Sequence, residues 1–160
     1  MGKSSGTTRS SSSGNPRGLT ENEGTLRGGI ILDTSAPDFR QREKAVHDEA
    51  NRILEEFAKS HGGQYSITDT ILNVEFGRAA FDVQEDGVIK RIHIGFSTTE
   101  SEGENISLNW SVGFHMTGPG AYEARSDAMT LRTQMLEYKT LGEAYRDATK
   151  KVNEFNRKHR

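Results

Sequence analysis

Residues 72–114 alternate apolar and polar side chains in four consecutive runs, and this pattern limits the possible fold more than any other feature of the sequence. Successive side chains of a β-strand point to opposite faces, so each run predicts a strand with one buried face and one exposed face. The predicted strands are residues 72–76, 79–83, 88–96 and 106–114. Their predicted buried side chains are Leu72, Val74, Phe76, Ala79, Phe81, Val83, Val88, Ile92, Ile94, Phe96, Ile106, Leu108, Trp110, Val112 and Phe114.

The apolar positions change from even to odd numbers across Gly77-Arg78 and back to even numbers across Asp86-Gly87. A two-residue hairpin requires such a change if both of its strands are to bury the same face. A leading glycine suits a type II′ turn and Asp-Gly suits a type I′ turn, so we expect a tight hairpin at each position. The predicted cross-strand pairs are Phe76–Ala79, Val74–Phe81, Leu72–Val83, Phe81–Ile92 and Asp82–Arg91.

An amphipathic helix is predicted on each side of the strands. The first is expected to begin at the N-cap Ser35, with Asp38 completing a capping box, and to end at Gly62-Gly63. The second is expected to begin at the capping box formed by Thr140 and Glu143. Each helix has one apolar stripe and the sheet has one apolar face. We therefore expect a two-layer α+β domain, with both helices packed on one face of an antiparallel four- to five-stranded meander.

Three further segments have less decisive patterns. Residues 128–138 fit both a strand and a helix, and we favour a fifth strand because a capping box follows so closely. The run Gly29–Leu32 is expected either to add an edge strand or to anchor the segment before it. The acidic residues 98–105 are expected to form a solvated loop, with a divalent-cation site as the weaker alternative.

The first 24 residues are rich in Ser, Gly and Thr and have almost no apolar content. They cannot bury enough surface to offset their ordering entropy, so we expect a disordered tail at 1–24 and a single domain at 25–160. The alternative role for the tail is weak contact with phosphate through Lys3, Arg9 and Arg17. The tail resembles those of uncharacterised proteins of bacterial phages and mobile elements, which would imply a similar genetic origin.

Composition narrows the range of functions. The chain has no cysteine, which excludes disulfides and thiolate chemistry, and no motif predicts a metal site or another cofactor. No apolar run reaches the roughly 20 residues that span a bilayer, and no secretory signal is recognisable at the N-terminus. We therefore expect a cytoplasmic protein without membrane contact. Net charge is +2 over residues 1–30, −8 over 31–130 and +4 over 131–160, far from the basic excess of a dedicated nucleic-acid binder.

The polar face of the predicted sheet is the candidate site. Glu75 or Asp82 could orient His93 as a general base, while Arg91 could hold an anion. Asp82 opposite Arg91 is also what a plain cross-strand charge pair looks like, and a flat face excludes little water. Small residues on the last strand would permit close approach of another surface. The residues expected to bind are Asn73, Arg91, His93, Asn109 and Ser111.

The leading hypothesis is a non-enzymatic interaction module that binds a protein partner, or a second copy of itself, through the open sheet face or an edge strand. The first alternative is nucleic-acid binding through a basic strip on the last helix, assisted by the tail. The second alternative is an enzyme that uses His93 with Glu75 or Asp82 and Arg91. The basic strip consists of Arg146, Lys150, Arg157 and Arg160.

Overall fold

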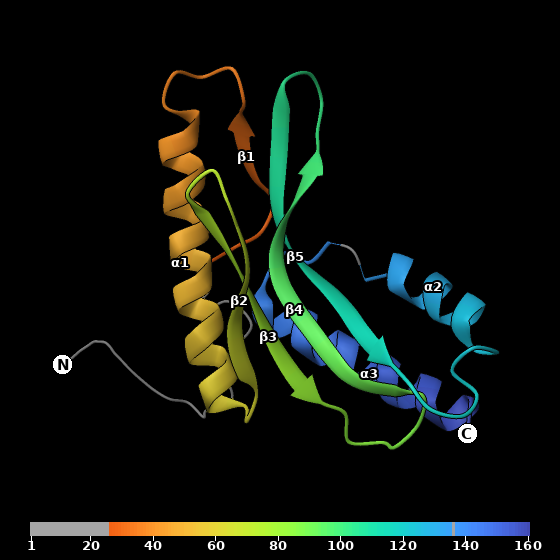
Figure 1. Cartoon of the computed structure of the whole chain (residues 1–160). Coiled ribbons are helices and arrows are strands. Elements are labelled where there is room, and N and C mark those ends of the chain that lie inside the picture. The colour runs from red at the N-terminus through yellow and green to blue at the C-terminus, as the bar shows by residue number, and fades with distance from the viewer. Residues whose placement is uncertain (1–25, 136) are drawn as a thin grey trace.

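The computed structural model describes residues 26–135 and 137–160 of the chain, so the tail predicted at residues 1–24 lies outside the described residues. Within these residues, five strands form one antiparallel sheet in the order β1-β5-β4-β3-β2 (Figure 1). Strands β2 to β5 are a meander, and β1 adds to the outer edge of β5. The elements are β1 (Ile30–Asp33), α1 (Phe39–Ser60), β2 (Gln64–Ile71), β3 (Val74–Asp82), β4 (Ile89–Glu100), β5 (Asn105–Met116), α2 (Arg125–Thr133) and α3 (Leu141–Lys158).

Helices α1 and α3 cover the same face of the sheet, which confirms the two-layer α+β architecture. The ring of Phe81 on β3 contacts both helices, with centroid distances of 6.0 Å to Phe57 on α1 and 4.9 Å to Tyr145 on α3. Trp110 is fully buried on this face, and its indole Nε1 donates to the carbonyl oxygen of Leu26 at 2.9 Å. In the described part of the chain, no helix lies over the opposite face of β3 and β4 (Figure 1).

The end of α1 follows the prediction, but its start does not. Gly62 has a φ of +72° just after the helix, as a glycine stop requires. The N-cap is Asp38 rather than Ser35, and its side chain makes no capping hydrogen bond. Ser35 instead donates both its backbone N–H and its Oγ to the carboxylate of Asp33, at 2.9 and 2.7 Å. The expected capping box is therefore replaced by a turn that begins at the end of β1.

The hairpin predicted at Gly77-Arg78 is wrong, because β3 runs straight through both residues. The turn lies at Leu72-Asn73, where both φ angles are positive (51° and 69°), and it joins β3 to β2, a strand that the pattern did not reveal. The change of apolar parity takes place inside β3 instead. The partner strand β2 has a bulge between Ile67 and Asp69 opposite this point, which shifts the register by one residue.

Across the second connection the predicted register is correct, but the predicted turn is not. Phe81 pairs with Ile92 and Asp82 pairs with Arg91. The connection is a loop of residues 83–88 rather than a two-residue turn, and Gly87 lacks the positive φ of a type I′ turn. The loop is held by Asn156 of α3, which is fully buried. Its amide donates to the carbonyl oxygens of Glu85 and Ile89 and accepts from the N–H of Ile89, at 2.7, 2.9 and 3.0 Å.

The strand favoured at residues 128–138 is also wrong, since α2 occupies 125–133. Within this segment, Tyr138 forms an isolated bridge to Trp110 on the outer edge of β5. Further along that edge, the N–H of Val112 donates to the carbonyl oxygen of Met135 at 3.3 Å. The edge strand considered at Gly29–Leu32 is present as β1, which pairs with the other part of β5. The outer edge of β5 is thus covered in turn by β1, Tyr138 and Met135.

Candidate binding face of the sheet

The open face is the side of β3, β4 and β5 that points away from α1 and α3. Cross-strand partners point to the same face, so the register arranges these side chains in rows. In order along the sheet, the rows are Asp82–Arg91–His115, Ala80–His93–Gly113, Arg78–Gly95–Ser111, Ser97–Asn109 and Thr99–Ser107.

His93 lies at the centre of a shallow part of this face. Its two cross-strand neighbours are Ala80 and Gly113, which have almost no side chain. A Cβ atom added at Gly113 would meet no other atom within 4 Å, so the space above β5 is open at this point. Gly95 follows His93 on the same face of β4. The face therefore has a floor of Ala80, Gly95 and Gly113 that another surface can approach closely.

The charged side chains around this floor are mostly basic. Burial lowers the pKa of His93, and the nearby charges of Arg78, His115 and Arg91 lower it further. Arg91 pairs with Asp82 across the strands, with 3.1 Å between Nε and Oδ1, as the register predicted. No described carboxylate pairs with Arg78. We call Arg78, Arg91, His93 and His115 the basic cluster.

The residues proposed for catalysis are not brought together. Among the described residues, His93 makes neither a hydrogen bond nor an ion pair, and its ionisable neighbours are cations. Asp82 is engaged by Arg91, and both side chains are largely exposed. Glu75 pairs with Thr70 of β2, five residues along β3 from the position that faces His93. A general base oriented by a carboxylate is therefore not formed on this face.

The side chains in the middle of the open face are short and polar. Ser97 on β4 donates its hydroxyl to that of Ser111 on β5 at 2.8 Å. Asn109 was expected to bind a partner, but only 2 % of it is exposed, and its amide donates to Ser107 Oγ at 3.1 Å. Its Oδ1 is buried without a hydrogen-bond partner among the described residues. Asn73 sits in the turn between β2 and β3, away from these rows.

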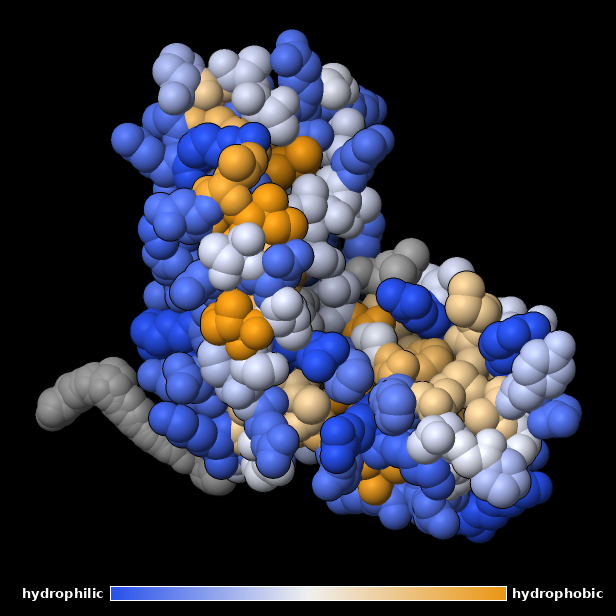
Figure 2. Space-filling model, in the orientation of Figure 1, coloured by the Kyte–Doolittle hydropathy of each residue, from blue (hydrophilic) through white to orange (hydrophobic). Residues whose placement is uncertain are grey.

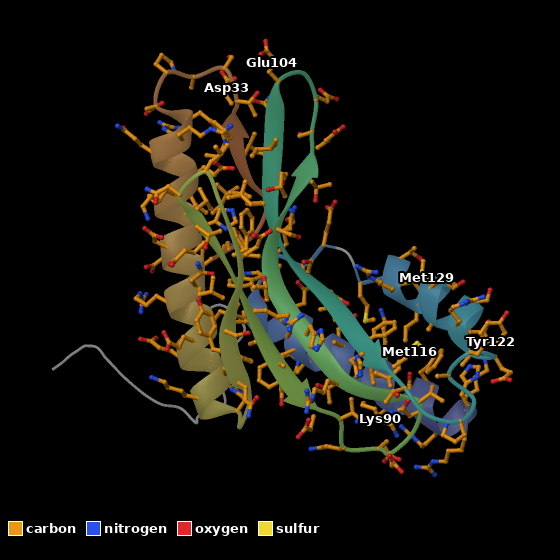
Figure 3. All side chains as sticks on the ribbon, viewed as in Figure 1. Asp33, Lys90, Glu104, Met116, Tyr122 and Met129 are labelled. Atoms are coloured by element: carbon orange, nitrogen blue, oxygen red, sulfur yellow. The ribbon has the colours of Figure 1, made fainter. Side chains whose placement is uncertain are left out.

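The far end of the β4–β5 hairpin is acidic. The strands run on to Glu100 and start again at Asn105, so the loop predicted at 98–105 shrinks to residues 101–104. Figure 3 shows Glu104 at this tip and Lys90 near the opposite end of the same hairpin. Glu100, Glu102 and Glu104, which we call the acidic tip, are exposed and form no ion pair with a described residue. No group of three potential metal ligands occurs in the described part of the chain.

Part of the basic strip on α3 is occupied by an intramolecular contact. Arg157 and Arg160 both approach the carboxylate of Glu85, at 3.9 and 2.8 Å. The other two residues, Arg146 and Lys150, line a hollow of about 570 Å³ together with Tyr138, Glu143 and Asp147. The hollow contains carboxylates as well as cations.

Strand β2 is the edge that sequence reasoning missed. Ile67, Ile71 and Leu72 are 42–67 % exposed, and Figure 2 shows separate hydrophobic areas over the β2–β3 hairpin. The bulge at Thr68 interrupts this edge, and the carboxylate of Asp69 accepts a hydrogen bond from the N–H of Thr70 at 2.8 Å. Bulges and charges on an edge strand oppose pairing with a further strand, so β2 is less suited to docking than the open face.

No helix in the described residues combines the length and the apolar character that crossing a membrane would take. Neither a protein-family model, nor a curated protein, nor a solved structure matches this chain.

Proposed function

We propose that this protein is a non-enzymatic binding module that docks another protein on the open face of its sheet. The observation that carries the proposal is the position of His93 between Ala80 and Gly113, within the basic cluster and above a floor of small residues. Such a floor allows close contact, and the cluster supplies charge for orientation and specificity. A catalytic role has less support, because no described carboxylate orients His93.

Nucleic-acid binding through α3 stays a prediction with weaker support. Two of its four cations, Arg157 and Arg160, share the carboxylate of Glu85. Affinity for a phosphate backbone grows with the number of phosphates that free cations neutralise, so this pairing reduces what the strip can contribute.

A chain without cysteine does not depend on disulfides, and we place the protein in the reducing cytoplasm. The origin in a phage or mobile element rests on the tail alone.

The absence of native cysteine allows a site-specific test. In the full chain, Gly113→Cys places a single thiol on the open face where a Cβ has room, and Ala45→Cys places one on the exposed side of α1. Each is labelled with a benzophenone maleimide and irradiated in an extract of the native host. We expect a discrete protein adduct, a second copy included, from position 113 only, and we expect unlabelled Arg78→Glu/Arg91→Glu protein not to compete for it. Equal labelling from both positions, or no adduct at all, would overturn the proposal.

A further inference from the structure

We infer that the partner of the open face is a second copy of this chain, packed face to face so that the acidic tip of each copy lies over the basic cluster of the other. This inference rests on the proposed function and names its partner. Apart from Arg78, which lies on the neighbouring strand β3, both charged groups belong to one hairpin, β4–β5, and they lie at opposite ends of it. Each copy therefore carries a surface and its electrostatic complement.

The spacing of the two groups fits a two-fold axis. At about 3.3 Å per residue, His93 lies roughly 23 Å from Glu100 along β4. Midway between the cluster and the tip is the row of Ser97 and Asn109. An axis that crosses the strands at Ser97 reverses the strand direction and sets His93 opposite Ser101 of the second copy. It sets Arg91 opposite Gly103, within the acidic tip.

The surface near this axis suits close packing. Ser97 and Ser111 have short side chains that bond each other, and Asn109 is buried and donates to Ser107 Oγ. Gly95 and Gly113 lie between this row and the basic cluster. Packed sheets lie about 10 Å apart, so short side chains at the centre leave the charged groups at both ends free to meet.

The charges are suited to such a contact rather than to one within a single copy. The tip carries three exposed carboxylates that pair with no described residue, although Glu100 lies on the face of its cross-strand partner Ile106 and not on the open face. The cluster contains Arg78, which no described carboxylate pairs with. The two groups lie too far apart on one molecule to neutralise each other. Only a second molecule brings them together, and it does so twice, because the arrangement is symmetric.

The test measures the dimer dissociation constant of the full chain by sedimentation equilibrium. We expect a dimer at low salt whose dissociation constant rises with added NaCl, because these contacts are exposed and screened. The tip variant is Glu100→Lys/Glu102→Lys/Glu104→Lys, and the cluster variant is Arg78→Glu/Arg91→Glu. Each alone should weaken dimerisation by roughly 100-fold, because like charges are then opposed. An equimolar mixture of the two variants should form a heterodimer, since both contacts are attractive again. The matched control, Asp48→Lys/Glu55→Lys/Glu56→Lys on the outer side of α1, should dimerise as the unmodified protein does.

A covalent measurement keeps the inference testable even if a charge variant fails to fold. Ser97→Cys puts one thiol at the level of the proposed axis, so a short bis-maleimide should join two copies, whereas Ala45→Cys should give none. A strict monomer at low salt, a dimer unaffected by the charge variants, or no cross-link from position 97 would overturn the inference. In that case an adduct of another mass from Gly113→Cys would leave the proposed function standing.

Discussion

Asn51 on α1 accepts a hydrogen bond from the backbone N–H of Gly77 on β3, at 3.0 Å. Its amide nitrogen donates to the carbonyl oxygen of Glu75, two residues away, at 2.9 Å. Strand β4 pairs with β3 only from Arg78 onward, so these two backbone groups have no partner strand. The side chain of Asn51 replaces the missing strand where the β2–β3 and β4–β5 hairpins separate.

We expect Asn51→Ala to lower the free energy of unfolding by about 2 kcal/mol, because two partly buried backbone groups lose the side chain that bonds to them. Urea denaturation followed by circular dichroism measures this change. Asn105→Ala is the matched control, since its side chain makes no hydrogen bond with a described residue, and it should cost much less. Equal effects of the two substitutions would show that Asn51 does not support the divided sheet.

Gly87→Ala should be destabilising by roughly 2 kcal/mol, a typical cost of overpacking. The new Cβ would lie 2.5 Å from both Cβ and Cγ of Asn156, which three hydrogen bonds hold in place. Gly113→Ala is the matched control, because nothing lies within 4 Å of its added Cβ and its φ is not positive. Thermal unfolding should show a lower Tm for the first variant and an unchanged or slightly higher Tm for the second. The opposite order would contradict the packing of the loop on α3.

The burial of His47 leads us to expect that the folded protein loses stability in acid. The ring is 1 % exposed beside Phe76 and Phe96, and neither ring nitrogen has a described partner. Burial lowers the pKa of His47, although Glu43 and Asp48 oppose this change. The unfolded chain therefore takes up the proton first, at its ordinary value of about 6.5. The stabilisation is complete above that pH and is lost as the pH falls from there toward the lower folded pKa.

Urea midpoints measured between about pH 5 and 8 check this dependence. In His47→Phe the slope of stability against pH should be smaller, because the uncharged ring has no proton to gain. The pKa of His93 is also lowered, so part of the slope should remain and should decrease further with His93→Gln. An unchanged slope in the His47→Phe protein would rule out the buried neutral ring.

The Asp82–Arg91 pair should contribute little to stability despite its 3.1 Å contact. Its side chains are 85 % and 57 % exposed, and ion pairs of this kind are worth about 0.2–1 kcal/mol. A double-mutant cycle with Asp82→Ala and Arg91→Ala should give a coupling energy in that range, falling further with added salt. A coupling above about 2 kcal/mol would mean that the pair is shielded from solvent, as a pocket over the face would require.

We could predict the register of β4 and β5 and the helical layer that covers them. Burial of one face makes apolar residues recur at every second position of these strands. Ile92, Ile94, Leu108, Trp110 and Val112 are all buried as expected. Strand β2 was not recognised from the sequence, and it is an edge strand whose side chains are almost all exposed on both faces. Its sequence signal is Tyr65, Ile67 and Ile71 at alternate positions between polar residues, an alternation that Asp69 interrupts next to the bulge.

The parity change at Gly77 was interpreted as a turn because a tight hairpin changes the pattern in this way. Strand β3 instead continues through Gly77, and Asn51, which is distant in sequence, bonds to the backbone at that point. Asn156 likewise stabilises a loop at Gly87, where the sequence pattern predicted a tight turn. On the candidate face, the pairing of Asp82 with Arg91 followed from register. The burial of Asn109 and the separation of Glu75 from His93 depend on tertiary packing.

The covering of one edge of β5 has a consequence for how the molecule assembles. Leu26 reaches the indole of Trp110 from 84 residues away, and Tyr138 meets the same residue from the carboxyl side. Neither segment can make these contacts until the β4–β5 hairpin has formed. The entropy of closing long loops is therefore lost before the contacts stabilise the chain, and folding should be slow for a chain of this size. Removing the chain up to and including Leu26 should therefore loosen the packing around Trp110. A change in the fluorescence of Trp110 would report it.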